Sequence, residues 1–226
     1  MLSLHWLRSS LGKKTLMALS GLILVGFVIM HLAGNLLVFA GPEALNAYAE
    51  KLRHIPVLLW SARTVLLAAI AVHVVTSVQL AHENAAARPQ RYAAYRTSEA
   101  TFTGRTMMLS GLLLLAYIIY HLLHFTFRVT NPSISNGLDA LGRRDVYAMV
   151  IMSFNHRAIS LAYILGMACL CAHLHHGIAS TWQTLGFADE RSLRIADLIG
   201  RVVALGLFAG YSAIPLAVLT GFLRLG

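Results

Sequence analysis

The chain has 226 residues, of which 58% are hydrophobic and only 12% are charged, and its formal net charge is +9. With a mean hydropathy of +0.68, this composition excludes an ordinary soluble domain and predicts an all-α integral membrane protein. The positive charge does not indicate a nucleic-acid partner, because the basic residues lie between apolar runs, where they orient a membrane chain among its lipids.

Five apolar runs are long enough to cross a bilayer, whose hydrocarbon core takes roughly 20 helical residues. The fourth run begins as early as Tyr147, so it is too long for one straight span. Its polar residues from Ser153 to Arg157 place the first turns at the interface, and the membrane part is expected from near Ala158. We treat residues 1–226 as a single transmembrane domain, with predicted spans at about 16–40, 57–81, 106–127, 158–182 and 198–223.

The loops differ in basic charge. Ten Lys and Arg residues fall on the side that holds the N-terminus, and six fall on the opposite side. Because positive loops remain in the cytoplasm, the sequence predicts a cytoplasmic N-terminus and an exoplasmic C-terminus. The first apolar run follows Arg8, Lys13 and Lys14 and is long enough to stay in the membrane, so we expect a retained span and not a cleaved signal peptide.

The first and third spans share a pattern in which Leu-Ser-Gly is followed by nine residues and a histidine. The pattern runs from Gly21 to His31 and from Gly111 to His121. The two spans run in the same direction, so both histidines are expected at one depth, about 14 Å before the exoplasmic end at 1.5 Å per residue.

The second and fourth spans run the opposite way and also contain histidines. His73 lies about ten residues, and His176 about seven residues, before the cytoplasmic ends of these spans. These two are expected at a second level, nearer the cytoplasm. His173 precedes His176 by three residues on nearly the same helix face, so it could take the place of His176.

Two histidine pairs, each at one depth and from two helices, are the arrangement that holds two b-type haems by bis-imidazole ligation. The predicted fold is therefore five transmembrane helices, four of them bundled around two haems. The alternative is that each histidine bonds a backbone carbonyl or lines a polar cavity in a haem-free transporter. His124, one turn beyond His121, is expected to contact a haem propionate or water.

Several long segments resemble, in order, the cytochrome b subunit of succinate dehydrogenase and fumarate reductase in its single-chain, five-helix, di-haem form. They are SSLGKKTLMALSGLILVGFVIMHLAGNL (9–36), GPEALNAYAEKL (41–52), the His73 helix with ENAAARPQRYA (83–93), the third-span GxxxxxxxxxH run, and HLHHGIASTWQTLGF (173–187).

The resemblance implies the membrane anchor of complex II, an enzyme of electron transport and the tricarboxylic acid cycle, in a bacterial cytoplasmic membrane. Its partners would be a flavoprotein subunit, which carries the dicarboxylate active site, and an iron–sulfur subunit, and the complex could form a higher oligomer. The chain would pass electrons to or from a quinone, either menaquinone or ubiquinone. The resemblance assigns His31 and His121 to a distal haem b, and His73 and His176 to a proximal one, with the His176–Gly177 step favouring His176 over His173.

Quinone chemistry exchanges two protons and requires a titratable group near a haem edge. On the exoplasmic side the candidates are Glu43, Glu50 and His54, after the first span. The cytoplasmic side, close to where the iron–sulfur subunit would dock, is the alternative location. Haem propionates need cationic or hydrogen-bonding partners, for which we expect Lys14, Ser20, Arg105 and Ser110 on the cytoplasmic side and Arg128, Arg143 and Arg144 on the other. A cytochrome b subunit of a hydrogenase or formate dehydrogenase is the related alternative.

Overall fold

The computed structural model describes the whole chain except residues 1–5, 7, 88–98, 188 and 226, and gives only the backbone of residues 99–105. The described part is helical and contains no β-strand beyond an isolated bridge between Leu138 and Arg144. Five of its helices are long and apolar enough to cross a membrane. The expectation of an all-α, multi-pass membrane protein is thus confirmed at this level.

The five spans lie close to the predicted positions. The first consists of α2 (Ser10–Asn35) and a 3-10 turn, η1 (Leu36–Ala40). The second is α4 (Pro56–Ala86), and the third combines α5 (Glu99–His121) with a π-helical turn, η2 (Leu122–Thr126). The fourth is α8 (Arg157–Thr184) and the fifth is α9 (Glu190–Leu219).

Helix α9 begins eight residues before the predicted fifth span because its polar first turns are capped. The Asp189 side chain accepts a hydrogen bond from the backbone N–H of Ser192 at 3.0 Å. Ser9 does the same for α2, accepting from Gly12 at 3.0 Å. Such caps satisfy N–H groups that a helix start leaves unpaired, so each helix extends beyond its apolar run.

The long fourth run is divided as expected. Helix α7 (Val146–Asn155) ends before His156, and α8 starts at Arg157. The His156 backbone is extended, with ψ of 108°, which breaks the helix between the two. Helix α7 therefore lies outside the fourth span.

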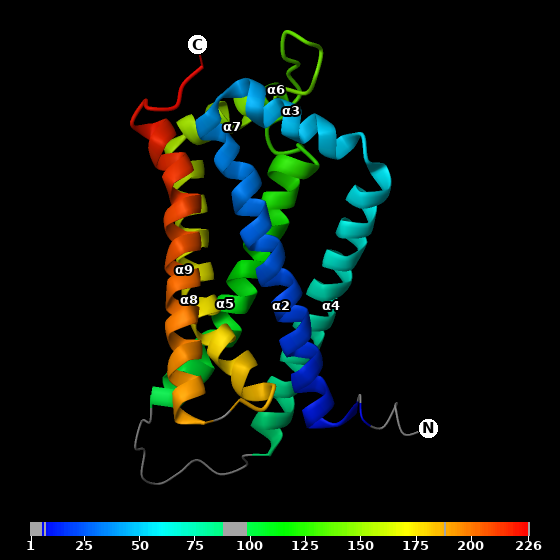
Figure 1. Cartoon of the computed structure of the whole chain (residues 1–226), viewed down its shortest axis with the longest axis vertical. Helices are drawn as coiled ribbons and strands as arrows, with labels where there is room; N and C mark the ends of the chain where they lie inside the picture. The colour runs from blue at the N-terminus through cyan, green and yellow to red at the C-terminus, as the bar shows by residue number, and fades with distance from the viewer. Residues whose placement is uncertain (1–5, 7, 88–98, 188, 226) are drawn as a thin grey trace.

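The odd number of spans puts the two chain ends at opposite ends of the bundle (Figure 1). We call these ends the N-side and the C-side. On the C-side the short helices α3 (Pro42–Arg53), α6 (Pro132–Ser135) and α7 gather over the bundle. The N-side has only the starts and ends of long helices among the described residues.

The best-buried core lies under this C-side layer. Val38, Leu45, Ile151, Tyr163 and Val218 belong to one cluster contributed by η1, α3, α7, α8 and α9. Helix α9 packs along α8, whereas α4 diverges from α2 toward the C-side (Figure 1). Many large apolar side chains elsewhere on the spans are exposed, as expected for helices that face lipid.

A buried asparagine joins the C-side helices. Asn46 of α3 is 1% exposed, and its amide nitrogen donates to Asp145 at 3.0 Å. Its amide oxygen accepts a hydrogen bond from the backbone N–H of Tyr147 at 3.0 Å. This one side chain therefore connects α3 to the start of α7.

We expect Asn46→Ala to lower the midpoint of thermal unfolding in detergent. The substitution leaves the buried Tyr147 N–H without its acceptor, which costs about 1–3 kcal/mol. Asn136→Ala is the matched control, because Asn136 is exposed and bonds only the Pro132 carbonyl. Equal midpoints for the two variants would show that the Asn46 bonds do not hold the layer together.

Candidate functional site

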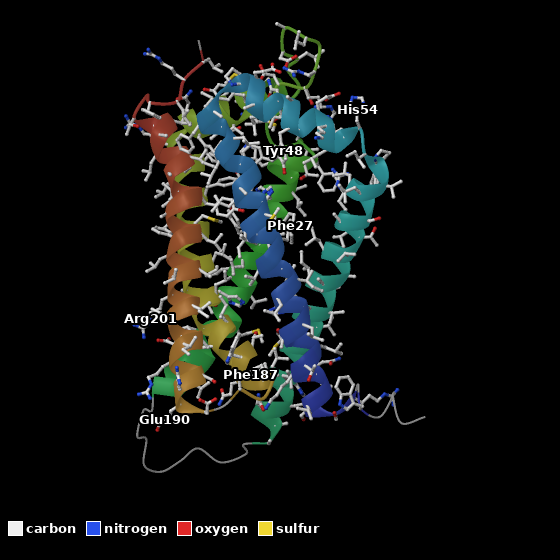
Figure 2. The ribbon with its side chains drawn as sticks, viewed as in Figure 1. Phe27, Tyr48, His54, Phe187, Glu190 and Arg201 are labelled. Carbon is white, nitrogen blue, oxygen red and sulfur yellow. The ribbon has the colours of Figure 1, made fainter. Side chains whose placement is uncertain are left out.

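The structure brings His31 of α2 and His121 of α5 together. Their ring centroids are 5.9 Å apart and the rings are nearly perpendicular, at 79°. Each ring also stacks on an aromatic residue one turn earlier, Phe27 at 5.2 Å and Tyr117 at 6.2 Å. Phe27 lies midway along α2, inside the bundle's length (Figure 2). The repeated Leu-Ser-Gly pattern thus extends to a matching aromatic residue and a facing histidine.

One nitrogen in this pair lacks a partner. The buried Nδ1 atom of His121 has no hydrogen bond to any described residue. A buried polar atom left unpaired is costly, so it indicates a partner outside the chain or a functional role.

The second pair differs from the prediction. His73 of α4 faces His173 of α8, with ring centroids 6.4 Å apart, whereas His176 stacks on His175 at 4.8 Å. The position expected for His176 is occupied by His173. A three-residue offset on a helix is too small for the sequence to decide which of the two faces the bundle axis.

The rotation of α8 that decides this depends on two close helix contacts. A side chain on Gly166 would come within 2.6 Å of the Tyr117 ring on α5, and one on Gly200 would come within 3.0 Å of the His175 carbonyl oxygen. Only a residue without Cβ lets α5 and α9 approach α8 at these points. These contacts turn His173 inward and His175 toward α9.

The Leu-Ser-Gly repeats contact the second pair. On α2, Ser20 Oγ lies 3.4 Å from His73 Nδ1, and on α5, Ser110 Oγ lies 3.0 Å from His173 Nδ1. The glycine after each serine has no side chain, and a Cβ there would lie 3.3 Å from His73 at Gly21 and 3.5 Å from His173 at Gly111. In each repeat, the serine and glycine therefore pack against one imidazole of the second pair.

These contacts select one tautomer for both rings. The Nδ1 atom of His73 lies 3.0 Å from the carbonyl oxygen of Met17, so it is the donor there. Ser110 donates its own proton to the Met107 carbonyl at 3.1 Å, which leaves its oxygen to accept from His173. With Nδ1 protonated, Nε2 carries a lone pair. This is the form in which a histidine binds a metal while its other nitrogen is held by the protein.

Both pairs have the spacing of two imidazoles on one metal ion. Metal–imidazole bonds of about 2 Å place the ring centroids of two opposed ligands about 6 Å apart, and the observed distances are 5.9 and 6.4 Å. Among the described residues, no group of three or more His, Cys, Asp or Glu side chains could hold a metal ion. Two imidazoles suit a metal whose remaining ligands come from a cofactor, as in haem.

The pairs lie at two levels of the bundle. Gly21, which contacts His73, and His31 are ten residues apart on α2, and Gly111 and His121 are ten apart on α5. Ten residues correspond to about 15 Å, so both helices give the same separation. The second pair is on the N-side and the first is nearer the C-side.

A cavity of about 470 Å³ opens on the N-side, next to the His73 pair. Its volume is in the range of cofactor sites. The Met17 carbonyl that holds His73 belongs to one of its lining residues, and the predicted propionate partner Lys14 is another. The polar lining is completed by Asn84, Ser180, Gln183 and Thr184.

A buried hydrogen-bond network follows His121. His124 is 1% exposed, its Nδ1 lies 2.9 Å from Tyr163 Oη, and its Nε2 lies 3.1 Å from Ser153 Oγ. Both ring nitrogens are engaged within the protein, in place of the expected propionate or water contact. The π-helical turn η2, a feature frequent at functional sites, turns His124 to these partners.

Of the residues predicted for quinone, Glu43 and Glu50 lie on α3 and His54 follows its last residue, at the C-side surface. Glu50 pairs with Arg53 and, at 2.9 Å, with His54, whereas Glu43 pairs with Arg143 at 2.6 Å. Hydrogen bonds from Arg143 hold the pKa of Glu43 below its usual range, and those from Arg53 do the same for Glu50. His54 marks the end of α3 and Tyr48 lies nearer α2 (Figure 2). Their role toward quinone stays a prediction.

Two of the remaining predicted propionate partners, Arg128 and Arg143, have their described contacts away from both histidine pairs. Arg143 is held by Glu43 and Asp139, and Arg128 reaches the Ser135 carbonyl at 3.5 Å. The Arg105 side chain lies outside the described residues. Sequence reasoning missed Tyr163, Ser153 and Tyr117, and of these only Tyr117 had a signal, its alignment with Phe27 in the repeat.

No family model, curated protein or solved structure matches the chain. Inferences about function therefore depend on the geometry of the histidine pairs and their supports.

We expect the Glu43–Arg143 ion pair to make the stability of the folded chain fall at acidic pH. Because the folded pKa of Glu43 is lowered, its contribution is present above the ordinary value of 4.5 and is lost as the pH falls below it. Arg143→Gln should therefore reduce the fall in thermal unfolding midpoint between pH 6 and pH 3, as followed by circular dichroism in detergent. Arg144→Gln, which leaves this ion pair intact, is the control, and identical acid sensitivity of the two variants would contradict the assignment.

Proposed function

We propose that the chain is a di-haem cytochrome b that carries electrons between a dehydrogenase partner and membrane quinone. The observation that carries the proposal is the pair of facing imidazoles at two levels, with centroid distances of 5.9 and 6.4 Å. His31 and His121 would hold one haem b, and His73 and His173 the other. His173 replaces His176 in this assignment because of its position opposite His73.

Haem iron with two imidazole ligands changes its oxidation state by one electron and leaves no position open for oxygen. The chain's own residues prepare the ligands for this. Met17 and Ser110 accept the Nδ1 protons of His73 and His173, which fixes both rings and leaves both Nε2 atoms free. Phe27 and Tyr117 restrict the rings of His31 and His121 by stacking.

The particular complex we propose is a succinate:quinone oxidoreductase in a bacterial cytoplasmic membrane. The chain's resemblance to that family supports this assignment, as does the excess of basic residues on the N-side, which favours a cytoplasmic N-terminus. A flavoprotein and an iron–sulfur subunit would dock on the N-side, next to the His73 pair and the cavity lined by Lys14. The dicarboxylate chemistry would belong to the flavoprotein.

Substitution of each histidine tests the pairing. We expect His31→Ala and His121→Ala each to remove the same haem b signal, and His73→Ala and His173→Ala each to remove the other. His176→Ala is the matched control on α8 and should retain both haems. The measurements are the pyridine haemochrome content and low-temperature spectra of the purified chain.

Several outcomes would contradict the proposal. Absence of haem b from the wild-type chain would favour the haem-free transporter. Loss of a haem in His176→Ala, with both retained in His173→Ala, would reverse the assignment on α8. Haem that is reduced by hydrogen or formate with a co-purified dehydrogenase, and not by succinate, would assign the chain to the related class.

The contact from Ser110 gives a finer prediction. Ser110→Ala removes the acceptor of the His173 Nδ1 proton, so the imidazole becomes less electron-rich and stabilises ferric iron less. The reduction potential of the N-side haem, the one that His73 and His173 would hold, should rise. The affinity of the chain for this haem should fall about tenfold. Ser77→Ala is the control, since Ser77 bonds only the His73 carbonyl.

Redox titration of the α-band absorbance measures this effect. The C-side haem should keep its potential in both variants. If Ser110→Ala shifted the C-side haem instead, or shifted neither, Ser110 would not position His173.

A further inference from the structure

A second group of polar side chains lies in the spans, on the outer face of α8 and α9. His175 Nε2 lies 2.9 Å from Asp197 Oδ1, and Arg201 donates to the other oxygen of Asp197. Asp197 lies one residue before the predicted fifth span and Arg201 three residues inside it, so the group lies at the N-side edge of the apolar stretch.

The close packing of α9 on α8 builds this group. Gly200 contacts the backbone of His175, where a Cβ would lie 3.0 Å from the carbonyl oxygen. Asp197 and Arg201 flank Gly200 on α9, so the approach brings both charges beside His175. Arg201 projects from the side of α9 that faces away from α2 and α4 (Figure 2).

A pocket of about 160 Å³ opens beside these groups. Its wall consists of Cys171, Ala172, Ala204 and Leu205, and its polar side consists of His175 and Arg201. A cavity of roughly 150 Å³ holds one benzene ring. The pocket therefore has room for a single flat ring, with hydrogen-bond donors on one side only.

The charges select a neutral ligand. Asp197 balances Arg201 and would repel a phosphate, which disfavours an anionic lipid headgroup. Arg201 has five N–H donors, more than Asp197 uses. Asp197 also accepts the Nε2 proton of His175, so the imidazole is held against the pocket. The ligand that fits is an uncharged, lipid-soluble ring with carbonyl acceptors.

We infer that this pocket binds the headgroup of a quinone, with Arg201 as hydrogen-bond donor to a carbonyl oxygen and His175 lining the pocket beside it. The inference rests on the proposed function for the source of electrons, since His173, the proposed ligand, is two residues from His175 on the same helix. It differs from the prediction on α3, because it places the quinone near the N-side level, on the lipid-facing side of α8.

Photolabelling of the full-length, haem-loaded chain in lipid nanodiscs tests the inference. The probe is an azido-substituted quinone with a single isoprene unit, and labelled peptides are mapped by mass spectrometry. We expect label within residues 171–176 or 201–205. Arg201→Gln should reduce it about tenfold, as expected for loss of a hydrogen bond to a charged group.

Arg194→Gln is the matched control. Arg194 lies two turns before Arg201 on α9 and is exposed, with Glu190 at 3.6 Å as its partner, so label should be unchanged. Arg201 is 60% exposed, so its replacement leaves the packed core intact. Label on α3 or at the N-side cavity, or label insensitive to Arg201→Gln, would overturn the inference. Displacement of the label by excess phosphatidylglycerol would also overturn it, in favour of a lipid site.

The haem content of the same samples separates this inference from the proposed function. A chain without haem b contradicts the proposed function. A chain with both haems but without label in the pocket contradicts the quinone site alone.

Discussion

An imidazole between apolar helices loses the hydration of two ring nitrogens, and the arrangement of this bundle follows from how that loss is offset. At the N-side pair, Nδ1 of each ring is held by a carbonyl or hydroxyl oxygen, which leaves Nε2 as an acceptor. At the other pair, stacking restricts the rings, and His121 keeps an unpaired nitrogen. The chain's own contacts therefore offset the loss more fully at the N-side pair than at His121.

The bundle is built from two similar halves, α2 with α4 and α5 with α8. In each half, the first helix carries the serine and glycine that seat an imidazole of the second helix, and ten residues later it contributes its own histidine to the other pair. The Leu-Ser-Gly pattern with its histidine therefore contributes residues to both histidine pairs. Helix α9 lies outside these halves, and its close approach to α8 at Gly200 creates a different polar site on the lipid side.

On the C-side, side-chain hydrogen bonds and ion pairs hold the short helices over the bundle. Asn46 is buried and joins α3 to α7, and the surface above it carries ion pairs such as Glu43 with Arg143. The acidic residues of α3 are engaged in these pairs. The N-side, in contrast, contains a cavity with polar lining residues next to a histidine pair, which is why electron entry is proposed there.

The sequence by itself determined the number of spans, the break between α7 and α8, and the facing of His31 and His121, because apolar length and equal spacing on parallel helices depend only on helix geometry. It did not determine which of His173 and His176 meets His73, since the rotation of α8 is set by its contacts at Gly166 and Gly200. Nor could it connect Ser20 and Ser110 to imidazoles on other helices, or Asp197 to His175. Those partners are distant in the chain, and only the packing of the helices brings them within hydrogen-bond distance.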